Sequence, residues 1–354
     1  MAATQTYRVV GLMSGTSLDG LDIALCVFTR SDEWGFSIEK AETVSYTTEW
    51  KSLLAGFHLL SGEELVRRHV EYGAFLGREV QGFLHRHRLS ADFVSSHGHT
   101  VFHRPADGFT FQAGCGASLA AASGLPVVFD FRTGDVARGG QGAPLVPIGD
   151  RYLFSEYSAC LNLGGIANIS FERGMERIAY DVSPCNLLLN HLAGRAGKEF
   201  DEDGIIAANG QVQTRLLEAL ERIDFYARPY PKSLGREDIE RDFLPLLSVE
   251  FSVEDSMATV CRHIAMQVGR SLSREERRGR MLVTGGGALH LQLMKELETA
   301  CPVEVVAGTS ELVHFKEALV FAFLGVLRQR GEVNVLRSVT GASDDHMAGS
   351  IALP

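Results

Sequence analysis

Several features that define other protein classes are missing from this chain of 354 residues. No run of about eighteen apolar residues occurs, so the sequence predicts no membrane-spanning helix. The first ten residues, MAATQTYRVV, lack the apolar core and cleavage site of a signal peptide. The net charge is −10, and no basic tract is long enough to follow a nucleic-acid backbone. We therefore expect a cytoplasmic protein that binds neither membranes nor nucleic acids.

Paired cysteines are also missing. The six cysteines are scattered, with no CxxC pair, which disfavours a disulfide framework and a zinc site and predicts buried thiols. Three histidines, His97, His99 and His103, lie close together, but no carboxylate or cysteine accompanies them at ligand spacing. A metal site there is the less favoured interpretation. The favoured one is a loop at the end of strand Phe93–Ser95 that offers Thr100 and imidazole groups to a polar ligand.

Common nucleotide and hydrolase motifs are absent as well: the chain has no GxxxxGK[ST], no GxGxxG after its first strand and no GxSxG. Three other glycine-rich turns follow apolar strands instead. They are VGLMSGTSLDGLD (Val10–Asp22), Gly164-Gly165 and Gly285–Gly287. Glycine lets the backbone approach a ligand closely, and consecutive N–H groups can bind an anion. A structural hairpin explains any one of these turns equally well, whereas three together favour a nucleotide site.

The first turn also carries polar side chains suited to phosphate. Thr16 and Ser17 supply hydroxyl donors, and Asp19 and Asp22 supply carboxylates that could hold a hydrated Mg²⁺. Arg132, after a predicted strand at Val127–Phe129, is a candidate fork for a carboxylate or phosphate, although an ordinary salt bridge is as compatible with its residue type.

A fourth segment suggests an acid or base. Ser183 is a good N-cap and Pro184 suits a first helical position, which predicts a helix from here to about His191. Asp181 would then lie at a strand end beside the helix N-terminus, where its carboxylate stays ionised and can accept a proton from water. The alternative for Asp181 is a simple turn or capping role.

The length predicts two domains, with a crossing in the Gly- and Pro-rich stretch after Arg132. Both halves begin with strand, glycine turn and strand, which fits a duplicated α/β architecture that holds ATP between two lobes. Phosphoryl transfer needs mainly phosphate-binding turns, Mg²⁺ and an oriented nucleophile, so this organisation favours a phosphotransferase.

The chain resembles the anhydro-N-acetylmuramic acid kinase family, part of the actin/hexokinase/Hsp70-like ATPase superfamily. The resemblance spans nearly the whole chain. Its segments are GLMSGTSLDGLD (Gly11–Asp22), SHGHTVFHRP (Ser96–Pro105), DFRTGDVARGGQGAPLVP (Asp130–Pro147), NLGGIANIS (Asn162–Ser170), KSLGRE (Lys232–Glu237), VTGGGALH (Val283–His290), KEALVFAFL (Lys316–Leu324) and VTGA (Val339–Ala342).

This resemblance implies a two-domain, actin-like (ribonuclease H-like) α/β fold with duplicated βββαβα-type cores and an interdomain cleft. The expected N-terminal lobe is 1–130 with 318–354, and the expected C-terminal lobe is 131–317. It also implies ATP and Mg²⁺ as cofactors, a homodimer and a role in cell-wall recycling. The implied reaction opens the 1,6-anhydro ring of 1,6-anhydro-N-acetylmuramic acid with water and phosphorylates O6, giving N-acetylmuramic acid 6-phosphate and ADP.

The resemblance further implies roles for individual residues. Asp181 is the expected catalytic base that deprotonates the attacking water. Thr100, Arg132 and Asn186 are the expected sugar-binding residues. The expected ATP-binding residues are Gly15, Thr16, Ser17, Leu18, Asp19, Gly20, Leu21, Asp22, Gly164, Gly165, Gly285, Gly286 and Gly287, with the last three beside the adenosine.

The chain departs from the family pattern at three places. DVSPCN (Asp181–Asn186) stands where DTGPGN is common, His99 stands in place of the glutamine of SHGQT, and Cys115 replaces an aspartate. These changes fall near the expected sugar side. Two alternatives therefore stay open: a kinase of the same fold for another amino sugar or anhydrosugar, and a non-catalytic sensor that binds ATP and wall fragments.

Overall fold

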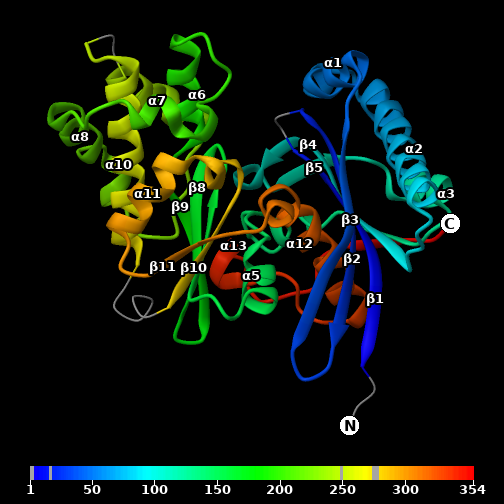
Figure 1. The fold of residues 1–354 in the computed structure, drawn as a ribbon. Helices are drawn as coiled ribbons and strands as arrows, with labels where there is room; N and C mark the ends of the chain where they lie inside the picture. Colours follow the sequence, from blue (N-terminus) through cyan, green and yellow to red (C-terminus); the bar gives the residue numbers. More distant parts are fainter. Residues whose placement is uncertain (1–3, 16–17, 248–249, 273–278) are drawn as a thin grey trace. The chain divides into compact units, whose positions relative to one another are not determined.

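The computed structural model describes residues 4–15, 18–247, 250–272 and 279–354. The chain forms two compact units, Met1–Leu153 with Phe315–Pro354, and Phe154–His314 (Figure 1). Residues 131–153 belong to the first unit and not to the second, where the sequence placed them. Two buried contacts hold this segment there: the hydroxyl of Thr340 donates to Asp135, and Lys316 pairs with Asp150 at 2.7 Å.

The first unit is built on a sheet with the strand order β12-β6-β4-β1-β2-β3, and β5 pairs with β4. Strands β1, β2 and β3 are antiparallel, whereas β4 runs parallel to β1 and to β6. The strands are β1 (Gln5–Ser14), β2 (Gly20–Arg30), β3 (Trp34–Ser45), β4 (Phe93–Arg104), β5 (Phe109–Ala113), β6 (Val127–Phe129) and β12 (Ser350–Ala352).

Helix α2 supplies much of this unit's core. It begins at Gly62, where the Ser61 side chain accepts a hydrogen bond from the N–H of Glu64, and ends at a left-handed Arg88. Its buried face, with Tyr72 and Phe83, joins the same core cluster as the sheet. The other helices are α1 (Thr48–Gly56), η1 (Phe57–Leu59), η2 (Pro105–Asp107), α3 (Gly116–Ser123), α4 (Thr133–Val136), α5 (Pro147–Leu153), α12 (Ser310–Arg330) and α13 (Arg337–Thr340).

The backbone of β1 passes very close to α12 at Gly11. A Cβ atom at this position would lie 2.0 Å from the carbonyl oxygen of Ala318. Only glycine fits such an approach, so Gly11, the first residue of the motif GLMSGTSLDGLD, is needed for the packing of β1 against α12.

The second unit has a sheet with the order β11-β10-β7-β8-β9. Strands β7, β8 and β9 pair antiparallel to one another, whereas β10 and β11 run parallel to β7. The first unit has the same arrangement. Both units thus share one ribonuclease H-like strand order, which confirms the predicted duplicated α/β fold. The strands are β7 (Ala159–Leu163), β8 (Ile166–Arg173), β9 (Glu176–Pro184), β10 (Arg280–Thr284) and β11 (Glu304–Ala307).

Helix α10 (Val253–Ser271) is the central helix of this unit, with eleven buried residues, among them Val260 and Ile264. It is capped by Ser252, whose side chain accepts a hydrogen bond from the N–H of Asp255. The remaining helices are α6 (Asn186–Arg195), η3 (Glu202–Gly204), α7 (Ile205–Ala208), α8 (Thr214–Glu221), η4 (Asp224–Ala227), α9 (Arg236–Asp238), η5 (Ile239–Phe243), η6 (Leu244–Leu246), η8 (Gly286–Leu289) and α11 (Leu291–Ala300).

Two local predictions were wrong. The stretch after Ser95 is not a loop, because β4 continues to Arg104 through a left-handed Gly98 and pairs with β5. Helix α6 begins at Asn186 and not at Pro184, since Ser183 and Pro184 extend β9 and pair with β8. The pairing of these residues in the sheet outweighs their local preference for a helix start.

All six cysteines are free thiols, and five of them are buried, as predicted. Within the described ranges, no helix is long and apolar enough to cross a membrane.

Candidate functional site

The first glycine turn connects β1 to β2. Strand pairing continues as far as Ser14 and Leu21, so Gly20, Leu21 and Asp22 lie in β2 and not in the turn. Leu18 is left-handed, with a φ of 60°, and its N–H donates to the carbonyl of Gly15. The expected phosphate ligands Thr16 and Ser17 lie outside the described residues.

The two carboxylates near this turn differ in their surroundings. Asp19 is exposed, whereas Oδ1 of Asp22 accepts a hydrogen bond from the hydroxyl of Thr43 at 2.6 Å. Among the described residues no group of three or more His, Cys, Asp or Glu side chains could hold a metal ion. Mg²⁺ is commonly held by one or two carboxylates together with water and substrate phosphates, so this donor set fits it.

A buried hydrogen-bonded network lies behind the turn. The hydroxyl of Tyr46 donates to Oγ of Ser14 at 2.8 Å and lies 2.6 Å from that of Tyr72. Oγ of Ser14 lies 3.1 Å from Nδ1 of His99. Burial lowers the pKa of His99 to about 4, so its ring is neutral at neutral pH. The network connects the end of β1 with β4, where half-buried Thr100 follows His99.

Arg132 follows β6, immediately before α4, and is held by two acceptors. Its Nε donates to Nε2 of His97 at 2.9 Å, and its Nη1 donates to the carbonyl of Gly142 at 2.6 Å. Burial lowers the pKa of Arg132 to about 10, while the carboxylate of Glu317 acts in the opposite direction. The guanidinium therefore remains charged, and its position is fixed by the protein, as expected for a group that binds an anion or an oxygen-rich ligand.

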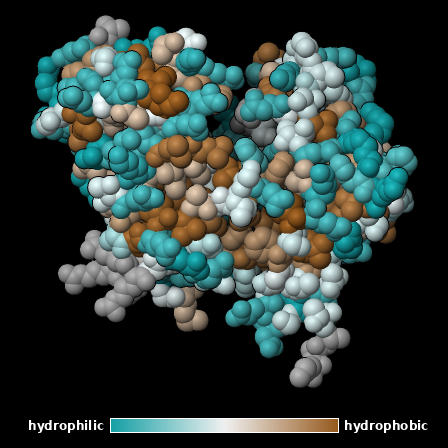
Figure 2. All heavy atoms as spheres, viewed as in Figure 1, coloured by the Kyte–Doolittle hydropathy of each residue, from teal (hydrophilic) through white to brown (hydrophobic). Residues whose placement is uncertain are grey.

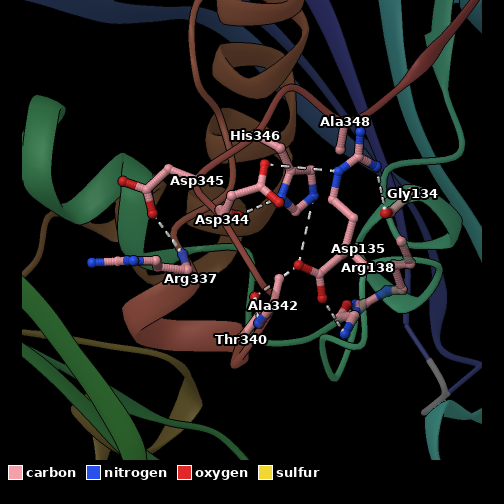
Figure 3. Close-up of polar contacts among 12 residues, drawn as sticks. Gly134, Asp135, Arg138, Arg337, Thr340, Ala342, Asp344, Asp345, His346 and Ala348 are labelled. Atoms are coloured by element: carbon pink, nitrogen blue, oxygen red, sulfur yellow. Dashed lines mark hydrogen bonds and ion pairs between the residues drawn. The ribbon is translucent and has the colours of Figure 1, made fainter.

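Asp135 holds Gly142 in place through the N–H of that residue, a role that the sequence did not reveal. Oδ2 of the fully buried Asp135 accepts the N–H of Gly142 at 2.6 Å, and Oδ1 accepts the hydroxyl of Thr340 at 2.7 Å. Nε2 of His346 lies 3.6 Å from the same carboxylate (Figure 3). Asp135 and Thr340 both lie in motifs of the family resemblance, and this position was the sequence signal that could have pointed to their roles.

Asp181 is a half-buried carboxylate within β9, opposite Asn168 of β8. Its Oδ2 accepts the N–H of Leu234 at 2.9 Å, and its own N–H donates to the carbonyl of Lys232. Two residues of the motif KSLGRE, Lys232 and Leu234, are therefore hydrogen-bonded to Asp181. Burial raises the pKa of Asp181 to about 6, and the Leu234 hydrogen bond only partly opposes this effect. The expected contact with a helix N-terminus was wrong, because β9 continues past Asp181.

The two glycine turns of the second unit lie against Asn186. The carbonyl of Gly164 accepts the N–H of Asn186 at 3.1 Å, and the Asn186 side chain donates to the Leu163 carbonyl at 3.0 Å. A Cβ on Gly287 would lie 3.3 Å from Oδ1 of Asn186. These contacts give Asn186 a structural part in holding the turns together.

The turn after β10 requires glycine. Gly285 has a φ of 80°, and a Cβ there would lie 2.7 Å from Oδ1 of Asn162. The turn continues as the short helix η8, and α11 begins only at Leu291. Leu289 and Leu291 are 48% and 63% exposed, and Figure 2 shows a hydrophobic area over this end of α11.

The predicted site residues thus fall into two sets. Gly15–Asp22, Thr100 and Arg132 belong to the first unit, and Gly164, Gly165, Asp181, Asn186 and Gly285–Gly287 belong to the second. Two units of one ribonuclease H-like strand order, with glycine turns after their strands, define a protein of the actin-like fold class.

The comparison with known sequences identifies the family. The family model for anhydro-N-acetylmuramic acid kinase matches residues 7–354, so the chain belongs to this family. The kinase of this name from Paramagnetospirillum magneticum is 36% identical over 98% of this chain and 99% of its own length. The one from Pseudomonas fluorescens is 34% identical over 97% of this chain and 98% of its own.

Among solved structures, the activator of the 2-hydroxyisocaproyl-CoA dehydratase from Clostridium difficile with bound ADPNP is similar at a TM-score of 0.44. Its sequence is 13% identical, and the match covers 91% of this chain and 97% of that one. A ROK hexokinase from Thermus thermophilus has a TM-score of 0.38 and 15% identity, over 90% of this chain and 99% of that one.

Proposed function

We propose that this protein is an ATP-dependent kinase that opens the 1,6-anhydro ring of 1,6-anhydro-N-acetylmuramic acid and phosphorylates O6. Its products are N-acetylmuramic acid 6-phosphate and ADP, which places the enzyme in cell-wall recycling. One observation carries the chemical part of the proposal: in a chain of this family, Asp181 is a half-buried carboxylate with a pKa of about 6. A base with that pKa is ionised at neutral pH and still basic enough to take a proton.

In the proposed reaction Asp181 removes a proton from a water molecule as its oxygen bonds to the anomeric carbon. The bond between that carbon and O6 breaks, and its electron pair goes to O6. O6 then bonds to the γ-phosphorus of ATP, and the bond from this phosphorus to the bridging oxygen breaks, so that ADP leaves. The Leu234 N–H supports the step by fixing one carboxylate oxygen, which leaves the other oriented for the water.

The ATP assignments follow the glycine turns. We assign the phosphates to Gly15–Asp22 and to Gly164 and Gly165, and the adenosine to Gly285–Gly287. Exposed Leu289 beside the third turn supports the last assignment, because an apolar side chain suits the face of a purine. Mg²⁺, when bound with ATP, would neutralise phosphate charge, and Asp19 and Asp22 are the carboxylates that we assign to hold it, directly or through water.

The sugar assignments rest on Thr100 and on Arg132, whose guanidinium is held by His97 and by Gly142. Asn186 remains a candidate sugar-binding residue, although its hydrogen bonds to the glycine turns favour a structural role. We also propose a cytoplasmic homodimer, and two lobes that correspond to the two units, with the sugar residues Thr100 and Arg132 in the first and the catalytic base in the second.

The test is product analysis in ¹⁸O-labelled water. Incubation with ATP and the anhydrosugar should give one product with ¹⁸O at the anomeric carbon and phosphate at O6. The variant Asp181→Asn should lose about 10²–10⁴-fold in rate, as expected when a general base is removed. An unlabelled anomeric oxygen, or near-normal activity of Asp181→Asn, would refute the mechanism.

A panel of sugars separates the remaining alternatives. If another amino sugar or anhydrosugar is phosphorylated with a higher kcat/KM, the enzyme acts on that sugar. If ATP and the anhydrosugar both bind and no ADP forms, the protein is a sensor and the proposed activity is wrong.

A further inference from the structure

A pocket with a volume of about 180 Å³ lies in the first unit, beside the first glycine turn. One part of its lining comes from β4, with His99, Thr100 and Val101. Another part is mostly apolar and comes from Leu54 and Ala55 of α1 and from Leu18 of the turn, together with the exposed His58 of η1. A pocket of this size is smaller than most complete ligand sites, so it suits one substituent of a ligand.

The hydrogen bonds around His99 determine what this side chain offers. The Tyr46 hydroxyl donates to Oγ of Ser14, so the hydrogen of Ser14 is available for Nδ1 of His99. With Nδ1 as acceptor, a neutral imidazole carries its hydrogen on Nε2. The ring is therefore an uncharged hydrogen-bond donor of fixed orientation, since its partners Ser14, Tyr46 and Tyr72 are all buried.

We propose that this pocket takes the acetamido group of the sugar, with His99 as donor to its carbonyl oxygen and the side chains of Leu54 and Ala55 against its methyl group. This inference rests on the proposed function, because it assigns one substituent of that substrate. His99 would then be a specificity-determining residue.

The other substituent of muramic acid, the lactyl group, fits the pocket less well. Its carboxylate is charged, and burying a charge without a cation is costly. His99 is neutral, Leu18, Leu54, Ala55 and Val101 are apolar, and the other histidine of the lining, His58, is exposed to solvent on η1. A neutral amide with one acceptor oxygen and a methyl group matches both parts of the lining.

The first experiment fills the pocket. The Ala55 side chain is exposed on α1, so Ala55→Leu adds bulk at the pocket without disturbing the core. We expect Ala55→Leu to raise the KM for the anhydrosugar about tenfold or more and to leave the KM for ATP unchanged. The KM for the analogue with a free 2-amino group should not change, because that analogue places nothing in the pocket. Ala106→Leu, at an exposed alanine outside the lining, is the matched control.

The second experiment tests the donor. His99→Gln retains an N–H donor and should keep kcat/KM for the anhydrosugar within about threefold, whereas His99→Leu should lose about tenfold. For the free-amine analogue, His99→Gln and His99→Leu should have equal kcat/KM, a result that a merely structural role of His99 does not produce. Thermal melting of each variant checks that it is folded.

The outcomes separate this inference from the proposed function. If the wild-type protein phosphorylates no anhydrosugar, the proposed function fails and this assignment fails with it. If wild type is active, and Ala55→Leu leaves the KM for the acetamido substrate unchanged or raises the KM for both sugars equally, only the pocket assignment is overturned. If the effect of Ala55→Leu disappears instead with an analogue that lacks the lactyl group, the pocket holds the lactyl group.

Discussion

Nε of Arg132 donates a hydrogen bond to Nε2 of His97, 2.9 Å away. His97 can accept this bond because its Nδ1 lies 2.8 Å from the carbonyl oxygen of Gly98, which accepts only and therefore places the ring hydrogen on Nδ1. Burial and the nearby guanidinium keep the pKa of His97 well below its usual value. The imidazole thus stays neutral and orients a permanent cation.

Arg132→Lys is expected to lower kcat/KM for the anhydrosugar by about 10–100-fold with little change in the KM for ATP. A lysine has one compact ammonium group and cannot donate to His97 and Gly142 in the fork geometry of arginine. Steady-state kinetics with both substrates measures this split. Arg138→Lys, at an exposed arginine of the same segment, should behave as wild type. Equal activity of Arg132→Lys and wild type would argue against a sugar-binding Arg132.

The pH dependence of kcat/KM should show an acidic limb with an apparent pKa near 6. Asp181 acts as a base only when ionised, and burial raises its pKa to about 6. The rate should therefore fall about tenfold for each pH unit below this value. A profile that stays flat between pH 5 and pH 8 would contradict the assignment. The residual activity of Asp181→Asn should lack the limb.

Asp181→Asn should also make the protein more stable at pH 8. A carboxyl whose folded-state pKa is about 6, against an ordinary 3.8, disfavours folding once it ionises. This penalty is absent below the ordinary value and grows as the pH rises to 6. Because Asp181 is partly exposed, we expect a gain of about 1–2 kcal/mol in the free energy of unfolding, measured by urea denaturation. The gain should shrink towards pH 4, and a gain independent of pH would show that another effect is responsible.

Lys316 and Asp150 form a buried ion pair in the first unit, with 7% and 5% of their side chains exposed. Lys316→Met removes this cation from a buried carboxylate and should cost about 3 kcal/mol of stability. The double variant Lys316→Met/Asp150→Leu should recover much of that loss. Lys295→Met, at an exposed lysine of α11, is the control and should change stability by less than about 0.5 kcal/mol. Additive losses in the double variant would show that the two side chains are not coupled.

Gly11→Ala should be strongly destabilising, by about 3 kcal/mol or more, since its Cβ would overlap the carbonyl of Ala318. Gly194→Ala provides the contrast. Gly194 lies in helix α6 with nothing within 4 Å of a Cβ, so alanine there should stabilise the protein by about 0.5–1 kcal/mol. Thermal melting of both variants tests the pair, and a neutral Gly11→Ala would mean that β1 and α12 can separate at little cost.

Local sequence patterns predicted those strand and helix bounds that depend only on residues nearby in the chain. Strand Val127–Phe129 appears with its predicted bounds, because a short apolar run with β-branched residues suits a buried sheet. The start of α6 was mispredicted, since the pairing of Ser183 with Ala167 is a long-range contact that overrides a good local capping signal.

The roles of the site residues stay predictions. Asp181 and Arg132 were singled out from predicted positions near strand ends and from the family resemblance, whereas the structure places Asp181 within β9. The supporting roles of His97 and Asp135 were not predicted, because both residues act through partners far along the chain; Asp135 contacts Thr340 across 205 residues of sequence. Residue type and spacing carry no information on such contacts. The raised pKa of Asp181 likewise comes from packing that only the folded chain creates.

The first unit is discontinuous in sequence, whereas Phe154–His314 form the second unit without interruption. During synthesis the second unit is complete when residue 314 has left the ribosome, while β1 still lacks the helix that covers Gly11. The half of the protein that is translated first therefore finishes folding last, because α12 covers β1 only after Phe315–Arg330 have emerged.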